Sequence, residues 1–294
     1  MKKLRTRNHS VVLNRTRAGD TGITIGLSIV GIIMLFPLVY TLLNAFKPLE
    51  EFFYFPPIIF PHNPTTENFS YLFQLMSTSW VPFSRYIFNT VFITVCGVAG
   101  NLIICSLAAY ALSKIPFPGH KFLFQVCQKS LMFSATVAGV ITFIVMTLLG
   151  WVDSYFAIII PAWASPMNLY LMKQFMEENI SDEMLESARL DGSSEFRTFL
   201  SIAMPLVKPG WLTLIVYSFQ GLWGTGSSPY IYSEQLKTIN YAIVQILSGD
   251  AAMSILRQGA GAASTVIMLI VPIIVFIISE SNIIETMGSS GMKD

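Results

Sequence analysis

The chain has 294 residues, of which 53% are hydrophobic and 12% are charged, and its mean hydropathy is +0.60. Since an average soluble domain carries roughly 25% charged residues, this composition excludes a typical soluble enzyme, a disordered chain and a nucleic-acid binder that acts through a basic surface. The formal net charge of +1 conceals a strong segregation of the charges along the chain.

The charged residues leave six long charge-free intervals. These intervals are residues 21–46, 86–113, 130–152, 154–172, 209–233 and 258–279. A bilayer core about 30 Å thick requires about 20 apolar residues of helix. The intervals therefore predict six transmembrane helices, the fourth of which is interrupted by Pro161 and Pro166.

The basic residues predict the orientation of these helices. With the N-terminus inside, the inside segments are 1–20, 114–129, 173–208 and 280–294, and they hold 14 of the 18 Lys and Arg residues. The positive-inside rule then places both termini in the cytoplasm. The first interval is too long for a signal-peptide core and lacks a cleavage pattern, so we expect it to be a retained helix.

The first outside segment, residues 47–85, combines prolines with aromatic residues. Five prolines lie between residues 48 and 64, which excludes a continuous helix there. The aromatic residues among them are Phe52, Phe53, Tyr54, Phe55 and Phe60. We expect this loop to pack on the membrane face or on a partner.

The inside segment 173–208 contains seven acidic and four basic residues in an amphipathic pattern. Ser181, followed by two acidic residues, predicts the start of a helix. The expected apolar face consists of Met184, Leu185, Ala188 and Leu190 before Gly192, and of Phe196, Phe199, Leu200 and Ile202 after it. This pattern predicts a helix–turn–helix outside the bilayer, which would serve as a docking surface for a cytoplasmic partner.

The same segment contains a spaced motif. Glu186, Ser187 and Ala188 are followed after three residues by Gly192, and after nine more by the sequence Ile-Ala-Met-Pro that ends at Pro205. This pattern resembles the EAA loop of bacterial ABC importer permeases, which reads E-A-A, three residues, G, nine residues, I-x-L-P. Ser187 stands where the family has Ala, and Met204 stands where it has Leu. Asp191 before the glycine resembles the carbohydrate-importer subset of that family.

The resemblance covers nearly the whole chain, which is similar to the MalG-like subunit of maltose-type importers. Residues 281–293 look closer to oligosaccharide permeases of Gram-positive bacteria. The resemblance implies an all-α polytopic membrane protein with the type I ABC importer permease fold. Its expected parts are a cytoplasmic tail (1–20), a permease domain (21–279) that includes the coupling loop (177–206), and a second cytoplasmic tail (280–294).

The resemblance also implies how the loop works and what it binds. The expected ATPase-coupling residues are Glu186, Ser187, Ala188, Asp191, Gly192, Phe196 and Pro205. Glu186 would pair with a basic group of the ATPase, and Gly192 would permit the turn that presents the loop. Without the spaced motif, the simpler interpretation is a solvated acid and a helix C-cap glycine.

No phosphate-binding G-K-[ST] sequence is present in the chain. We therefore expect no catalytic residue, metal or cofactor here, with ATP and Mg bound by a separate ATPase. The implied partners are a second homologous permease that forms a heterodimer with this chain, two ATPase subunits, an extracellular solute-binding protein, a sugar or oligosaccharide and the lipid bilayer, but no nucleic acid. The expected location is the bacterial cytoplasmic membrane.

Polar and aromatic residues within the predicted spans are candidates for a substrate pathway. They are Asn44, Asn89, Asn101, Tyr217, Gln220 and Trp223. Tyr217, Gln220 and Trp223 are spaced by three residues and share one helix face, which would bind a sugar by stacking and hydrogen bonding. The alternative is that these residues hydrogen-bond between helices or form an aromatic belt.

The outside segment 226–257 resembles the loop that reaches into the binding protein in maltose-type systems, and residues 241–247 predict a short amphipathic helix. Three other functions stay open at this stage. The chain would be an ABC permease for a non-carbohydrate solute, an ATP-independent secondary transporter, or a membrane enzyme or sensor. The absence of an intramembrane acid disfavours the secondary transporter, and the absence of a catalytic motif disfavours the enzyme.

Overall fold

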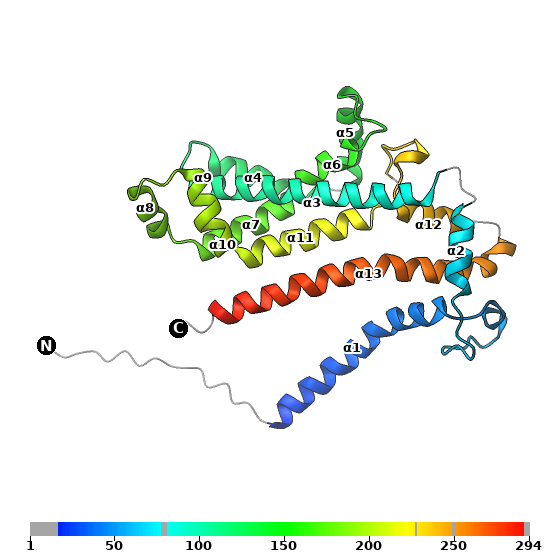
Figure 1. Cartoon of the computed structure of the whole chain (residues 1–294). Coiled ribbons are helices and arrows are strands. Elements are labelled where there is room, and N and C mark those ends of the chain that lie inside the picture. The colour runs from blue at the N-terminus through cyan, green and yellow to red at the C-terminus, as the bar shows by residue number, and fades with distance from the viewer. Residues whose placement is uncertain (1–16, 78–80, 134, 227, 249–250, 291–294) are drawn as a thin grey trace.

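The computed structural model describes residues 17–77, 81–133, 135–226, 228–248 and 251–290. Throughout these residues the regular structure is entirely helical, which confirms the all-α prediction (Figure 1). The helices are α1 (Arg17–Ala45), α2 (Glu67–Ser77), α3 (Phe83–Lys114), α4 (His120–Ser130), α5 (Ala135–Leu148), α6 (Phe156–Trp163), α7 (Pro166–Asn179), α8 (Asp182–Leu190), α9 (Glu195–Thr198), α10 (Met204–Leu206), α11 (Lys208–Trp223), α12 (Ile239–Leu247) and α13 (Ala251–Ser290). Shorter segments are the 3₁₀ helices η1 (Leu49–Phe53) and η3 (Glu234–Leu236) and the π-helix η2 (Phe199–Ala203).

Three of the described helices are long and apolar enough to cross a membrane, over Gly19–Ala45, Phe83–Lys114 and Arg257–Ser281. A fourth crossing is available if α11 is counted together with the preceding helix, from which it is bent by 83°. The predicted intervals 130–152 and 154–172 instead contain shorter helices. The described helices thus support three or four crossings by length, and the six-span topology stays a prediction.

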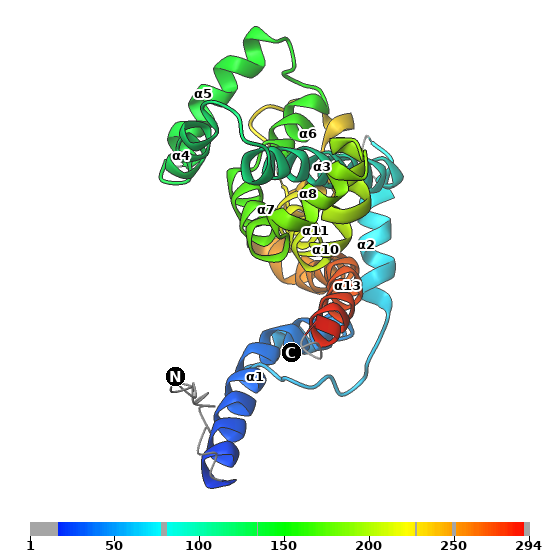
Figure 2. The ribbon, with the colours of Figure 1, turned by 90° about the vertical axis from the view of Figure 1, so that its left-hand side faces the viewer.

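Helix α3 lies at the centre of the larger helical group. It packs against α6, α7 and α11, and α11 in turn packs against α13 (Figures 1 and 2). The core of this group is formed by buried apolar residues of α3, α7, α8 and α11, with Met172 and Leu214 completely buried. A second core joins α2, α12 and α13, and α1 contacts α13 along its edge. Figure 1 shows α8 and α2 at opposite ends of the molecule.

The break between α6 and α7 explains why the interval 154–172 is not one helix. Pro166 opens α7, and Ser165 at its N-cap accepts a hydrogen bond from the backbone N–H of Asn168 at 3.4 Å. Backbone carbonyls freed by a broken helix need partners inside a membrane protein. Asn101 of α3 supplies one, because its Nδ2 donates to the Ala162 carbonyl at 2.7 Å.

The segment between α11 and α13 is mostly packed against the helices rather than free. Residue Asn89 of α3 donates to the carbonyls of Gln235 and Lys237, both at 2.8 Å, and Thr90 accepts from the backbone N–H of Ile239 at 2.9 Å. Helix α12 confirms the predicted short amphipathic helix, and its Ala242 lies in the second core. Residues 235–243 of the segment that resembles a reaching loop are therefore fixed on the body of the protein.

Candidate functional site

The coupling loop begins where α8 follows α7 through a short turn. Ser181 takes the N-cap position with an extended backbone, as the sequence predicts, but its side chain makes no capping hydrogen bond. The next residue, Asp182, forms an ion pair with Lys114 of α3 at 2.9 Å. Lys114 Nζ also donates to the carbonyl of Ile180 at 2.6 Å. The end of α3 thus fixes the start of α8.

Gly192 ends α8 in a Schellman turn. Its φ of +77° lies in the left-handed region, which costs any residue with a Cβ about 1–2 kcal/mol. The backbone N–H of Gly192 donates to Arg189 and that of Ser193 donates to Ala188, both at 3.0 Å, which is the Schellman pattern. Gly192 therefore caps α8 and reverses the chain toward α9. It is both the turn glycine that the motif implies and the helix C-cap of the simpler interpretation.

The predicted apolar face of the loop is divided between core and solvent. Leu185 and Ala188 are buried, and Leu185 joins the core of α3, α7 and α11. The expectation that Leu190 shares this face is wrong, because Leu190 is 88% exposed. At 100° per residue, it lies about 140° around the helix from Leu185. The remaining exposed apolar side chains are Met184, Phe196 and Leu200, whereas Phe199 is buried.

A charged contact closes the turn between α8 and α9. Arg189 Nε lies 2.7 Å from Glu195 Oε1, and the Tyr110 hydroxyl of α3 donates to Glu195 Oε2 at 3.1 Å. The hydrogen bond from Arg189 lowers the pKa of the Glu195 carboxyl, and the same contact raises the pKa of the Arg189 guanidinium. Sequence reasoning missed these three residues. The only local signal was a pair of opposite charges on either side of Gly192.

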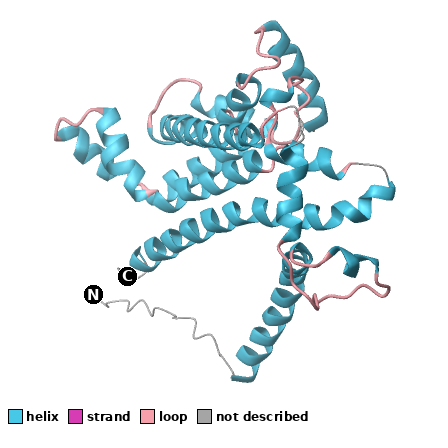
Figure 3. Cartoon of the chain, turned by 45° about the vertical axis from the view of Figure 1, so that its right-hand side comes forward, coloured by secondary structure: helices cyan, strands magenta, loops and turns pink. Residues whose placement is uncertain are grey.

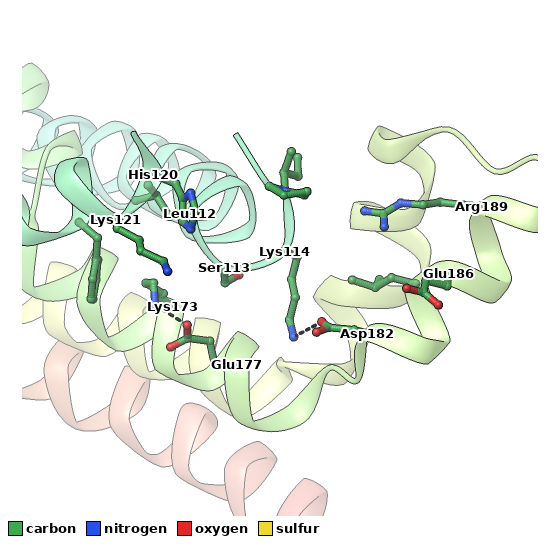
Figure 4. A pocket seen from close by; sticks show the side chains of 14 residues that line it. Leu112, Ser113, Lys114, His120, Lys121, Lys173, Glu177, Asp182, Glu186 and Arg189 are labelled. Carbon is green, nitrogen blue, oxygen red and sulfur yellow. Dashed lines mark hydrogen bonds and ion pairs between the residues drawn. The ribbon is translucent and has the colours of Figure 1, made fainter. Parts of the chain in front are cut away.

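A cavity of about 490 Å³ lies between α8, α7 and the connection from α3 to α4 (Figure 4). Lys114 and Lys173 line it, and each already has an acidic partner, Asp182 and Glu177 respectively. Glu186 also lines the cavity and is exposed. Within the described residues it forms no hydrogen bond and no ion pair, so its carboxylate is available to a basic group of another chain.

The other coupling residues occupy both sides of the loop. Ala188 is buried, whereas Ser187, Asp191, Phe196 and Pro205 are exposed. Pro205 lies in α10, one helical turn before the bend into α11. Within the motif, Ala188 packs against the core and Gly192 turns the chain. Glu186 and the other coupling residues are exposed.

The structure does not gather the substrate-pathway candidates in one place. Tyr217 and Gln220 are exposed on α11. Trp223, which continues the same stripe, donates from Nε1 to the Met268 carbonyl of α13 at 3.0 Å. Asn44 lies at the end of α1, where its buried Oδ1 has no hydrogen-bond partner.

Asn101 and Asn89 are buried, and their amides are occupied by contacts within the chain. Asn101 Oδ1 accepts from Asn168 Nδ2 at 2.7 Å and from the Ser218 hydroxyl at 2.8 Å, which joins α3, α7 and α11. Asn89 Oδ1 accepts from the hydroxyl of Tyr155 at 2.7 Å. These contacts match the alternative in which polar residues of the spans hydrogen-bond between helices.

The fold is that of a helical membrane protein with a helix–turn–helix, α8 and α9, at one end. The sequence matches the family described as "Binding-protein-dependent transport system inner membrane component" over residues 15–284, and the chain belongs to that family. It is therefore the membrane-embedded permease subunit of an ABC importer, a transport subunit rather than an enzyme.

Individual relatives and one solved structure agree with this assignment. The chain is 32% identical over 214 residues to protein LplC of Bacillus subtilis (strain 168), covering 72% of this chain and 70% of LplC. It is 27% identical over 275 residues to the galactooligosaccharide permease GanQ of the same organism, covering 91% and 93% of the two chains. A crystal structure of a bacterial ABC transporter involved in import of the acidic polysaccharide alginate matches with a TM-score of 0.76 at 22% identity, over 91% of this chain and 98% of that one. The type I permease fold is thus shared, and the predicted family is confirmed.

Proposed function

We propose that this permease translocates a sugar or oligosaccharide that an extracellular binding protein delivers. The name of the GanQ relative supports a carbohydrate cargo, and Asp191 before Gly192 is similar to the carbohydrate-importer form of the motif. The observation that carries the proposal is the turn between α8 and α9, which presents an exposed Glu186 and exposed apolar side chains. A chain that transports alone has no need of such a surface.

The proposed assembly contains a second homologous permease, two ATPase subunits and the binding protein. ATP and Mg bind to the ATPase subunits, and this chain contributes no cofactor site and no nucleic-acid surface. Six spans with both termini in the cytoplasm place the coupling loop 177–206 on the ATPase side of a bacterial cytoplasmic membrane. The distribution of 14 of the 18 basic residues supports that orientation.

Coupling proceeds through the buried side of α8. The exposed residues Glu186 and Phe196 contact the ATPase, while Leu185 packs in the same core as Met172 of α7. A displacement of α8 is therefore carried into α3 and α7 through close-packed side chains. The contact from Tyr110 to Glu195 adds a polar link between the turn and α3.

The substrate pathway is assigned to the exposed part of the α11 stripe. Tyr217 offers an aromatic face and a hydroxyl, and Gln220 offers an amide on the same helix face. Asn44, Asn101 and Trp223 then position the helices that surround the pathway, since the latter two use their polar groups within the chain.

Transport measurements on vesicles test this proposal. Vesicles that contain the chain, its co-purifying subunits and the binding protein should take up a labelled oligosaccharide only when ATP is present. Tyr217→Ala and Gln220→Ala should reduce uptake while ATPase co-purification is kept. Uptake by the isolated chain without ATP would contradict the proposal. ATP-driven uptake of a non-carbohydrate solute, without uptake of any oligosaccharide, would show that the transported substrate is not a carbohydrate.

A further inference from the structure

The loop that follows α1, residues 47–65, is held together by buried, hydrogen-bonded side chains. Two charged side chains are buried in it, since Lys47 is 2% exposed and Glu51 is 5% exposed. Lys47 Nζ donates to the carbonyl of Ile58, and Glu51 Oε1 accepts from the backbone N–H groups of His62 and Asn63 at 3.0 and 3.3 Å. Burying a charge is costly unless it is hydrogen-bonded, so these contacts fix the path of the loop.

The root of the loop is fixed as well. Asn68 of α2 donates from Nδ2 to the carbonyls of Ala45 and Lys47, at 2.9 and 2.8 Å. The backbone N–H of Thr65 donates to the carbonyl of Phe46 at 2.8 Å, which brings the two ends of the loop together. The loop is therefore a defined projection between α1 and α2 rather than a slack connection (Figure 3).

The outer surface of this projection is apolar. Its large exposed side chains are Phe53, Tyr54, Phe55, Ile59 and Phe60. Phe55 is 95% exposed, the highest value among the exposed large hydrophobic side chains of the described chain. No charged residue occurs from Phe52 to Pro61. Contiguous exposed apolar groups of this kind mark a surface that contacts a membrane or another protein.

The position and chemistry of the loop favour a lipid surface. It starts two residues after α1, along which most large apolar side chains between Ile23 and Leu42 are exposed, and the aromatic cluster begins at Phe52 in the same loop. Figure 1 places the loop at the end of α1, at the same end of the molecule as α2 and the start of α13. Tyr is enriched at the membrane–water interface, and Phe is among the side chains that interfacial segments bury at the boundary of headgroups and acyl chains. The stretch from 52 to 61 carries no charged side chain that insertion into a lipid phase would bury.

We propose that the aromatic loop, residues 52–60, inserts into the headgroup region of the bilayer and anchors the end of α1 there. The ligand is the lipid surface itself. The buried Lys47 and Glu51 hold the loop in shape, so that the aromatic side chains reach the interface without prior reorganisation. The proposal is independent of the cargo, and it holds for either orientation of the chain in the membrane.

Depth-dependent quenching tests the anchor in the full-length chain, in vesicles of phosphatidylethanolamine and phosphatidylglycerol. The three cysteines Cys96, Cys105 and Cys127 are replaced by Ala, and an environment-sensitive fluorophore is attached to Phe55→Cys. Leu190→Cys in the coupling loop is the matched control, because Leu190 is also an apolar side chain with 88% exposure. Both sites are exposed, so neither label disturbs the core.

The label at Phe55→Cys should emit at shorter wavelength than the label at Leu190→Cys. It should be quenched by a lipid with a nitroxide near the headgroup, and iodide quenching should be several-fold weaker than in the control. Emission and iodide quenching equal to those of the control would overturn the proposal. A blue shift that occurs only after the extracellular binding protein is added, without nitroxide quenching, would also overturn it and would assign the loop to a protein partner. The same readout from Phe60→Cys shows whether the whole cluster is inserted.

Discussion

The two ends of the permease are fixed by different forces. The segment 230–239 is fixed by hydrogen bonds from polar side chains, including Asn89 and Thr90 of α3. The turn between α8 and α9 is fixed by apolar packing of Leu185 and Phe199, to which Glu195 adds contacts with Arg189 and Tyr110. Directional hydrogen bonds specify one position, whereas a packed apolar face allows a rigid unit to transmit displacement. In the proposed mechanism, the first end holds its geometry and the second transmits movement from the ATPase.

Asp153 adds further hydrogen bonds to the segment 230–239. Its Oδ1 accepts from the backbone N–H groups of Tyr232 and Ser233 at 2.9 and 2.8 Å, and its Oδ2 accepts from the Ser233 hydroxyl. The hydrogen bonds from Ser233 lower the pKa of the Asp153 carboxyl. Asp153 thus stays ionised and keeps the segment attached throughout the neutral range.

The largest effect is expected for Asn89→Leu. This change removes both donors to the segment and the acceptor of Tyr155, and each buried polar group left unpaired costs about 1–3 kcal/mol. The melting temperature measured by fluorescence-detected gel filtration should fall strongly. Asn179→Leu is the control, because Asn179 is exposed and donates only within its own helix to Phe175, and it should leave the melting temperature nearly unchanged. An equal change in both variants would refute the polar account of this end.

A smaller effect on stability, with a clear effect on transport, is expected for Gly192→Ala. The left-handed φ of +77° costs an alanine about 1–2 kcal/mol, and the strain changes how α8 is presented. ATP-dependent uptake should fall, and Gly192→Asn should retain more of it because Asn tolerates this conformation. Gly31→Ala is the control, since Gly31 lies within helix α1 with open space around it. Full uptake by Gly192→Ala would show that the turn has no role in coupling.

The smallest effect is expected for Glu195→Gln. Glu195 and Arg189 are about half and one third exposed, and exposed ion pairs contribute roughly 0.2–1 kcal/mol. Because the pKa of Glu195 is lowered in the folded chain, its contribution is present above the unfolded pKa and is lost as pH falls through the folded pKa. Hydrogen–deuterium exchange of the backbone amides at 192–195, corrected for the intrinsic effect of pH, should therefore accelerate on acidification in the parent chain but not in Glu195→Gln. The same acceleration in both would contradict this role.

The sequence was sufficient to predict the parts of the coupling loop that depend on local geometry. Gly192 was identified from the spacing of its motif, because a left-handed C-cap requires glycine almost regardless of tertiary context. The interruption before Pro166 was predictable from the proline, whereas the expectation that Pro161 also breaks the helix is wrong, because Pro161 lies inside α6. The assignment of Leu190 to the buried face failed, since a short helix buries only the residues on the side that its neighbours contact.

The long-range polar contacts could not be predicted from the sequence. An asparagine in an apolar helix either lines a pathway or hydrogen-bonds to a neighbouring helix, and both uses follow the same sequence pattern. Asn101 was a pathway candidate, and the structure instead occupies its amide with Ala162, Asn168 and Ser218. The pairing of Tyr110 with Glu195 joins residues 85 positions apart, so no local pattern indicates it.

The central claim is that the exposed face of α8 binds the ATPase through Glu186, and one co-purification measurement tests it directly. The tagged parent chain, Glu186→Ala and Glu183→Ala are isolated from membranes of cells that express the whole assembly. Glu183 lies on the same helix, is also exposed and carries the same charge, so its loss controls for net charge. We predict that the ATPase co-purifies with the parent and with Glu183→Ala and is lost or strongly reduced with Glu186→Ala. Equal recovery of the ATPase with both variants would contradict the account.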